Sequence, residues 1–244
     1  MTTAAPHCLN CNATLMSSQR FCSECGQAAD TRRLTLHDIA HAMVHVFTHA
    51  DHSVFSLVRD LTFRPGRVAR DYIDGKRRKY FNPFTFVLVV VGVASLVLAA
   101  TRFVDFNRDI PTNPVSAFLQ NHLNLVILIQ LPILAAFGKL LFRADKLNFA
   151  EHLALAAYTS GFRSIFFTLV VIPIWLVFEI PYNNVLGVYI ALWLFYYSVG
   201  CAQLYRGNRW WLWVKGVFVA VLTQTVITAA IVGAIWLWFA VLKR

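Results

Sequence analysis

The sequence predicts an all-α integral membrane protein, a bundle of about five transmembrane helices behind a small cysteine-rich module. Three observations predict this fold class. The 244 residues are 58% hydrophobic and only 14% charged, whereas soluble domains contain about 25% charged residues. Apolar segments of transmembrane length fill the chain after residue 82, and four of the five cysteines lie within the first 25 residues. We therefore expect three parts: 1–30, 31–82 and 83–244.

The first part contains two cysteine pairs, Cys8-x-x-Cys11 and Cys22-x-x-Cys25. Two such pairs at this spacing present four thiolates to one tetrahedral zinc ion at about 2.3 Å. Asn12 and Gly26 follow the two pairs, and both residue types accept the left-handed turn that such a knuckle requires. The sequence therefore predicts a zinc ribbon, with a structural rather than a catalytic ion because four thiolates fill its coordination shell.

The second part begins with Thr35 and Asp38, the pattern of a helix capping box. Histidines then recur every four residues: His37, His41, His45 and His49. This spacing suits a second metal site, for zinc, nickel or copper, or it simply marks a polar helix face. Arg64-Pro65-Gly66 is expected to break the helix, and a short second helix is expected to end near Gly75.

A basic cluster immediately precedes the membrane part: Lys76, Arg77, Arg78 and Lys79. Such a cluster attracts anionic lipid headgroups, or it acts only as a topology signal. Half of the 22 lysines and arginines precede residue 81, beside the first apolar segment. The net charge of +10 is therefore explained by membrane topology, and nucleic acid is not expected as a partner.

The third part contains five apolar segments of transmembrane length: 83–104, 122–142, 162–180, 184–205 and 211–242. Basic residues alternate between rich and poor loops, which predicts a cytosolic N-terminus and a C-terminus outside. In a bacterial cell this means the inner membrane with a periplasmic C-terminus. Tryptophans at both ends of the last segment match the two membrane interfaces.

Four polar residues in the membrane part form a candidate polar site: Gln130, Glu151, His152 and Arg163. Ionisable residues in membrane spans are functional candidates because they are costly there. We expect residues 148–161 to form an interfacial helix, so that Arg163 snorkels at the cytosolic edge. In an unbroken helix, Arg163 would instead lie deep in the membrane and need an acidic partner.

A series of residues resembles a family of bacterial membrane proteins known as domain of unknown function 3667. The resemblance covers most of the chain and rests on Asp51, Arg64-Pro65-Gly66, Asp71-Tyr72, Gly75-Lys76-Arg77, Tyr80, Pro83, Asn148-Phe149 and Glu151-His152. The chain departs from the pattern at Ser56 and at Tyr158, where a second histidine is common. The layout alone is similar to that of Yip-type five-span membrane proteins.

These features predict a non-enzymatic adaptor or organiser whose ribbon and basic head bind a cytosolic protein or anionic membrane lipid. The motifs of nucleotide-binding and hydrolytic enzymes are missing from the sequence. The alternative is a transporter or channel for a small solute, ion or lipid through the polar site. A lipid-modifying enzyme using Glu151 and His152 is a third hypothesis. The sequence leaves open whether the chain forms a homo-oligomer.

Overall fold

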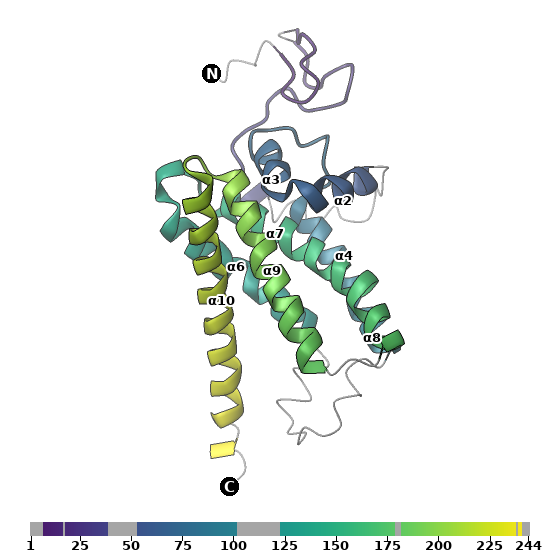
Figure 1. The fold of residues 1–244 in the computed structure, drawn as a ribbon. Helices are drawn as coiled ribbons and strands as arrows, with labels where there is room; N and C mark the ends of the chain where they lie inside the picture. Colours follow the sequence, from purple (N-terminus) through teal and green to yellow (C-terminus); the bar gives the residue numbers. More distant parts are fainter. Residues whose placement is uncertain are drawn as a thin grey trace.

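The computed structural model describes residues 7–16, 18–38, 53–101, 123–178, 182–237 and 239–240. The described residues outside the cysteine module are mainly helical. Long helices run side by side, α2 (Ser53–Phe63) and α3 (Pro65–Ile73) lie across one end, and the cysteine module lies beyond them (Figure 1). The far end of α10 (Arg209–Leu237) lies at the opposite end of the molecule.

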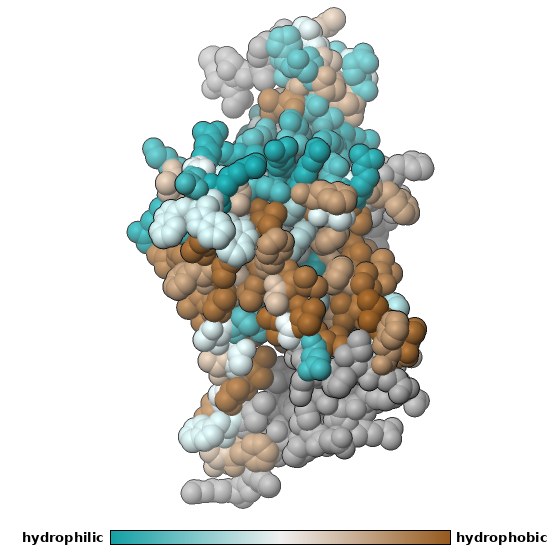
Figure 2. All heavy atoms as spheres, in the orientation of Figure 1, coloured by the Kyte–Doolittle hydropathy of each residue, from teal (hydrophilic) through white to brown (hydrophobic). Residues whose placement is uncertain are grey.

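Within the described residues, four helices are long and apolar enough to cross a membrane: Pro83–Thr101, Phe149–Phe178, Gly187–Leu204 and Arg209–Ala234. They belong to α4 (Pro83–Thr101), to α7, η2 and α8 together, to α9 (Tyr182–Leu204) and to α10. The remaining expected span corresponds to α6 (Leu123–Leu141), whose apolar stretch Val126–Leu141 is shorter. Hydrophobic side chains form a band around these helices, below a hydrophilic cap (Figure 2).

The expected break before the third span is wrong. A single helix runs through α7 (Phe149–Phe166), the π-helical segment η2 (Phe167–Val171) and α8 (Ile172–Phe178). It begins with a complete capping box, in which Asn148 accepts from the Glu151 N–H and Glu151 accepts from the Asn148 N–H. Such a box satisfies backbone donors at a helix start. Arg163 therefore lies about 20 Å along a continuous helix and does not mark its edge.

The break between α2 and α3 is confirmed, and α3 packs directly on the membrane part. Pro65 occupies the first turn of α3, where its missing N–H costs nothing. Gly66 lies so close to α9 that a Cβ at this position would overlap the carbonyl oxygen of Gly200. The Gly66 N–H donates to Gln203 Oε1 at 3.1 Å. The head helices and the membrane helices therefore share one hydrophobic core.

Helix α7 is central in this core, because it packs against α3, α4, α6 and α9. Small residues allow the close packing: a Cβ at Gly161 would lie 2.6 Å from a ring carbon of Phe86 on α4. Tyr158 fills the junction with the head and donates to the Phe81 carbonyl at 2.8 Å. The membrane part and α3 are thus held together around one helix.

Candidate metal centre

The four N-terminal cysteines gather into one cluster. The sulfur atoms of Cys8 and Cys25 lie 3.6 Å apart, as do those of Cys11 and Cys22, and all four lie within 4.8 Å of one another. A tetrahedron with metal–sulfur bonds of about 2.3 Å has sulfur–sulfur edges of about 3.8 Å. The four thiols are free rather than paired in disulfides. Their number, chemistry and spacing therefore fit one divalent metal ion.

The two cysteine pairs have the same backbone geometry. The Asn12 N–H donates to the Cys8 carbonyl and the Gly26 N–H to the Cys22 carbonyl, both at 2.9 Å. Asn12 and Gly26 have φ angles of 64° and 72°, the left-handed conformation expected from the sequence. Each pair also closes an isolated β-bridge, His7 with Thr14 and Phe21 with Ala28. The module is therefore a pair of matching knuckles that face one another.

The thiols differ in acidity before any metal binds. Burial disfavours the Cys25 thiolate, but hydrogen bonds from the Asn10 side chain and the Gln27 backbone lower the pKa of this thiol to about 7. The backbone of Ala13 favours the Cys11 thiolate, yet burial and the neighbouring thiols raise the Cys11 pKa to about 12. A divalent cation would stabilise all four thiolates together.

Gln27 fastens the second knuckle to the turn that precedes the first membrane helix. Its side chain is buried, with 5% of its surface exposed. The amide nitrogen donates to the Gly75 carbonyl and to Thr31 Oγ1, and the amide oxygen accepts from the Arg78 N–H at 2.9 Å. Gly75 has a φ of 105°, and a Cβ there would lie 2.7 Å from the side chain of Leu9. The knuckles are therefore packed against this turn.

The linker after the module is fastened to α7 by an ion pair. Arg33 donates to both carboxylate oxygens of Glu151, at 2.7 and 2.8 Å, and Nη2 also reaches the Lys146 carbonyl at 2.6 Å. Glu151 is 3% exposed, and its carboxylate raises the pKa of Arg33. Asn148 donates to the Leu34 carbonyl at 2.8 Å. The start of α7 thus holds the linker by an ion pair from Glu151 and by a neutral hydrogen bond from Asn148.

The juxtamembrane basic residues are partly engaged within the chain. Lys76 and Lys79 lie 2.7 and 3.6 Å from the two carboxylate oxygens of Asp71. Arg77 donates to the Arg32 carbonyl at 2.6 Å and lies over the Tyr72 ring. These contacts hold the turn against which the knuckles pack. Lipid binding by this cluster stays a prediction.

The histidine series lies largely outside the described residues. His41, His45 and His49 are not described, whereas His37 is exposed in the first turn after Thr35. The predicted capping box is confirmed, since Thr35 Oγ1 accepts from the Asp38 N–H at 3.3 Å and Asp38 Oδ2 accepts from the Thr35 N–H at 3.0 Å. Metal binding by the series stays a prediction.

The four polar residues of the membrane part do not form one cluster. Glu151 pairs with Arg33, and the buried His152 shares a 2.7 Å hydrogen bond with the Tyr205 hydroxyl. Arg163 lies several turns further along the helix and donates to Gln130 Oε1 at 3.0 Å. An acidic partner for Arg163 is missing among the described residues. The expected convergence of Glu151, His152 and Arg163 in a transport path is therefore not seen in the described part of the chain.

Several residues that shape these sites were missed by sequence reasoning. Gln27 and Arg33 are isolated polar residues in a basic head, and nothing in their spacing points to Gly75 or Glu151. Tyr205 and Tyr189 lie at or near the ends of an apolar segment, where aromatic residues are ordinary. For Glu151, a signal was present: an Asn148-x-x-Glu151 pattern indicates a capping box and so a helix that begins there.

Comparisons with known proteins give one match. The sequence model of the family described as "Protein of unknown function (DUF3667)" matches residues 51–94. This segment includes α2, α3, the basic turn and the first half of α4, and it contains the Arg64 to Pro83 motifs of the sequence resemblance. The searches of curated proteins and of solved structures find no match. Residues 51–94 are therefore similar to the DUF3667 family, the family named from the sequence, and the match does not extend to the cysteine module or to the later helices.

Proposed function

We propose that the chain is a non-enzymatic adaptor of the bacterial inner membrane. The ribbon binds one structural zinc ion through Cys8, Cys11, Cys22 and Cys25 and binds a protein partner in the cytosol. The observation that carries the proposal is the double attachment of the ribbon and its linker, by Gln27 to the basic turn and by Arg33 to Glu151. A module fastened in this way presents its outer surface in a fixed orientation to the membrane.

The outer surface of the ribbon offers apolar contact area. Met16 and Phe21 are 70% and 64% exposed, although both side chains are apolar. Exposed apolar and aromatic residues grouped on a small module are typical of protein interaction sites. Four thiolates would fill the coordination shell of the zinc ion, which leaves no open position for a substrate. The module is too small for a hydrophobic core of its own, so metal binding would supply its folding free energy. This combination supports docking rather than catalysis.

The two ends of the molecule face opposite sides of the membrane, and the basic turn contacts lipid headgroups. The ribbon and the basic turn face the cytosol, following the loop charges, and the end of α10 faces the periplasm. Lys76 and Lys79 keep 40% and 48% of their side-chain surface exposed while they pair with Asp71. Their charges therefore contribute to attraction for anionic headgroups at the same surface.

The first experiment tests the metal. Cys22→Ser should remove the zinc that copurifies with the detergent-solubilised chain, because a tetrahedral site loses one of its four thiolates. We expect about one zinc per wild-type chain by elemental mass spectrometry. Cys201→Ser is the matched control, since this thiol is buried in α9 away from the ribbon. Equal zinc content in both variants would contradict the ribbon assignment.

The second experiment tests the adaptor role. A double variant, Met16→Ser with Phe21→Ser, should lose cytosolic proteins that crosslink to the wild-type chain in cells and are identified by mass spectrometry. Glu24→Ala is the control, because this residue is exposed on the same module and its side chain ends in a charged carboxylate. Both variants should keep their zinc. A partner retained equally by both variants, or no cytosolic protein crosslinked to the wild type, would contradict the proposal.

The transporter and enzyme alternatives have less support. Glu151 is held by Arg33 and the Asn148 N–H, and His152 by Tyr205, so both side chains already have partners. Neither shares a contact with Arg163 among the described residues. A transport path or an acid–base pair would need these groups to face a common cavity. The separate engagement of the three side chains favours the adaptor.

A further inference from the structure

Both knuckles of the ribbon contact the turn that leads into α4. In the first knuckle, Leu9 lies so close to Gly75 that a Cβ added to the glycine would be 2.7 Å from the leucine side chain. In the second knuckle, the Gln27 side chain donates to the Gly75 carbonyl and accepts from the Arg78 N–H at 2.9 Å. Gly75 is buried and has a φ of 105°. One residue of the turn therefore contacts both knuckles.

The polar contacts between the two knuckles run through thiol groups. Cys8 lies beside Cys25 and Cys11 lies beside Cys22, with 3.6 Å between the sulfur atoms of each pair. In the described residues, the backbone hydrogen bonds of the ribbon stay within one knuckle or within the loop between the knuckles. Because thiolates at this spacing repel one another, a bound metal ion would supply the attraction that holds the two knuckles together.

Gln27 reaches the turn only when the second knuckle is formed. Its backbone carbonyl accepts from the Cys22 N–H at 2.8 Å, so Gln27 belongs to the hydrogen-bonded loop of this knuckle. Its side chain is buried against the turn. A metal module that is too small for its own core unfolds when the metal is removed. Loss of the metal would therefore withdraw Gln27 and deprive the Gly75 carbonyl and the Arg78 N–H of their partner.

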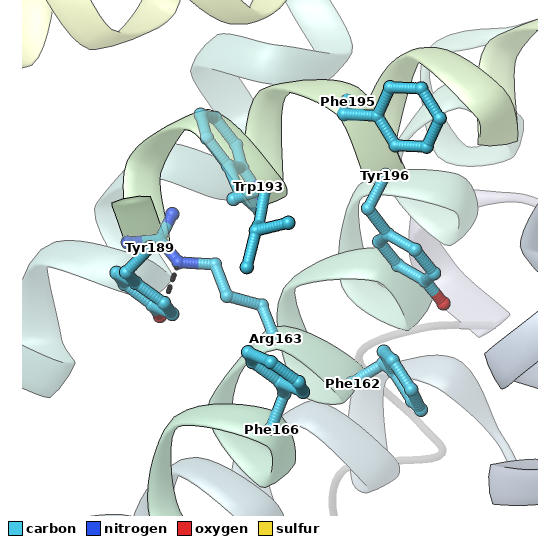
Figure 3. Close-up of a pocket in the computed structure, with 8 residues that line it drawn as sticks. Phe162, Arg163, Phe166, Tyr189, Trp193, Phe195 and Tyr196 are labelled. Atoms are coloured by element: carbon cyan, nitrogen blue, oxygen red, sulfur yellow. Dashed lines mark hydrogen bonds between the residues drawn. The ribbon is translucent and has the colours of Figure 1, made fainter. Parts of the chain in front are cut away.

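The linker after the ribbon is held without the knuckles. Only a few residues after Gln27, Arg33 donates to both carboxylate oxygens of Glu151 at the start of α7. Further along, α7 is joined to α9, where Arg163 donates to the Tyr189 hydroxyl at 2.7 Å (Figure 3). Neither contact involves a residue of the ribbon. Unfolding of the ribbon would therefore end at Arg33 and leave α7 and α9 in place.

We propose that metal binding by the four cysteines is a switch that fastens the ribbon to the basic turn. In the metal-bound state both knuckles pack on Gly75, and the exposed apolar side chains of the ribbon have a fixed orientation. In the metal-free state the ribbon is a flexible segment that ends at Arg33, while the helices keep their packing. The zinc supply thus regulates whether the ribbon docks onto its partner. This inference rests on the proposed function and adds its regulation.

Coupling between two sites is reciprocal, so the contact with the turn also strengthens metal binding. Gln27→Ala removes the amide contacts but keeps the four thiols and the backbone bond to Cys22. Its zinc affinity, measured on the purified full chain by competition with a chromogenic chelator, should fall at least about fivefold. Gln19→Ala is the matched control, since the Gln19 side chain contacts only the Met16 N–H in the loop between the knuckles, and it should bind zinc as the wild type does.

The two ways in which this experiment can fail are distinct. Equal zinc affinity of the wild type and both variants would overturn the proposed switch and leave the zinc ribbon intact. A wild-type chain that binds no zinc would overturn the proposed function, and the switch with it.

Hydrogen–deuterium exchange tests where the release ends. Removal of zinc with EDTA should speed amide exchange in the knuckles and in peptides that contain Arg78, whose N–H loses its acceptor. The start of α7 and the contact between Arg163 and Tyr189 should exchange equally in both states. Gln27→Ala should show faster exchange at Arg78 even with zinc bound, whereas Gln19→Ala should not. Exchange at Arg78 that is the same with and without zinc would overturn the proposal, as would faster exchange along all of α7.

Discussion

At the scale of single residues, a few polar side chains connect segments that are distant in the sequence. Gln27 uses both ends of its amide to join a knuckle to the basic turn, and Arg33 uses two nitrogens to hold Glu151. The Arg33 contact joins a largely exposed side chain to a buried carboxylate, whereas the Gln27 amide is itself buried. A buried carboxylate without a partner is costly. Removing the partner of Glu151 should therefore destabilise the fold by more than the intact ion pair stabilises it.

The Arg33 pair leads to a prediction. Arg33→Ala leaves the Glu151 carboxylate, 3% exposed, without its cation and should lower the free energy of unfolding by about 1–3 kcal/mol. Arg32→Ala is the control, since Arg32 contributes its backbone carbonyl rather than its exposed side chain. Thermal unfolding in mild detergent measures both variants. Equal midpoints for the two would show that the Arg33–Glu151 pair does not stabilise the fold.

At the scale of elements, glycines decide how closely helices approach. Gly66 brings α3 onto α9, and Gly161 brings α7 onto α4. The same glycines explain what the sequence predicted correctly and what it did not. Arg64-Pro65-Gly66 was read as a break, and α2 does end at Phe63. Gly161 was taken to end an interfacial helix, but in the structure it allows packing against Phe86, so the helix continues.

Substitution of these glycines gives a second prediction. Gly66→Ala should destabilise the fold by about 1–3 kcal/mol or more, because the new Cβ meets backbone atoms of α9 that have no room to move. Gly92→Ala in α4 is the control: its Cβ meets nothing within 4 Å, and helix propensity should add up to about 1 kcal/mol of stability. Thermal unfolding in detergent compares the two. A neutral Gly66→Ala would contradict the close approach of α3 and α9.

The local patterns of the sequence predicted most of the helices and the cysteine cluster, but not the continuous helix Phe149–Phe178 or the contacts between distant segments. The spacing of Cys8, Cys11, Cys22 and Cys25 predicted that the thiols gather, because each pair forms its own short turn. The partners of Arg163 could not be predicted, since Gln130 and Tyr189 are each ordinary in an apolar segment. Hydropathy places a residue in a span, but it does not say which faces of two spans meet.

At the scale of the whole molecule, the ribbon and the far end of α10 lie at opposite ends (Figure 1). The proposed orientation predicts different accessibility for Arg209, at the start of α10, and Ala240, which follows the end of α10 at Leu237. An impermeant maleimide applied to intact bacterial cells should label Ala240→Cys and should not label Arg209→Cys; both positions are exposed. Permeabilised cells, in which both variants should react, provide the control. The reverse pattern in intact cells would place the ribbon outside the cytosol.

The attachment by Gln27 also has a mechanical consequence. The turn that receives the knuckle leads within a few residues into α4, and Tyr80 at its end donates to Asp60 of α2 at 3.0 Å. A force applied to the cysteine module is therefore not taken up by a flexible linker. The contacts of Gln27 and Tyr80 pass the force to α2 and α4 together, so a protein bound to the module as proposed would pull directly on these helices.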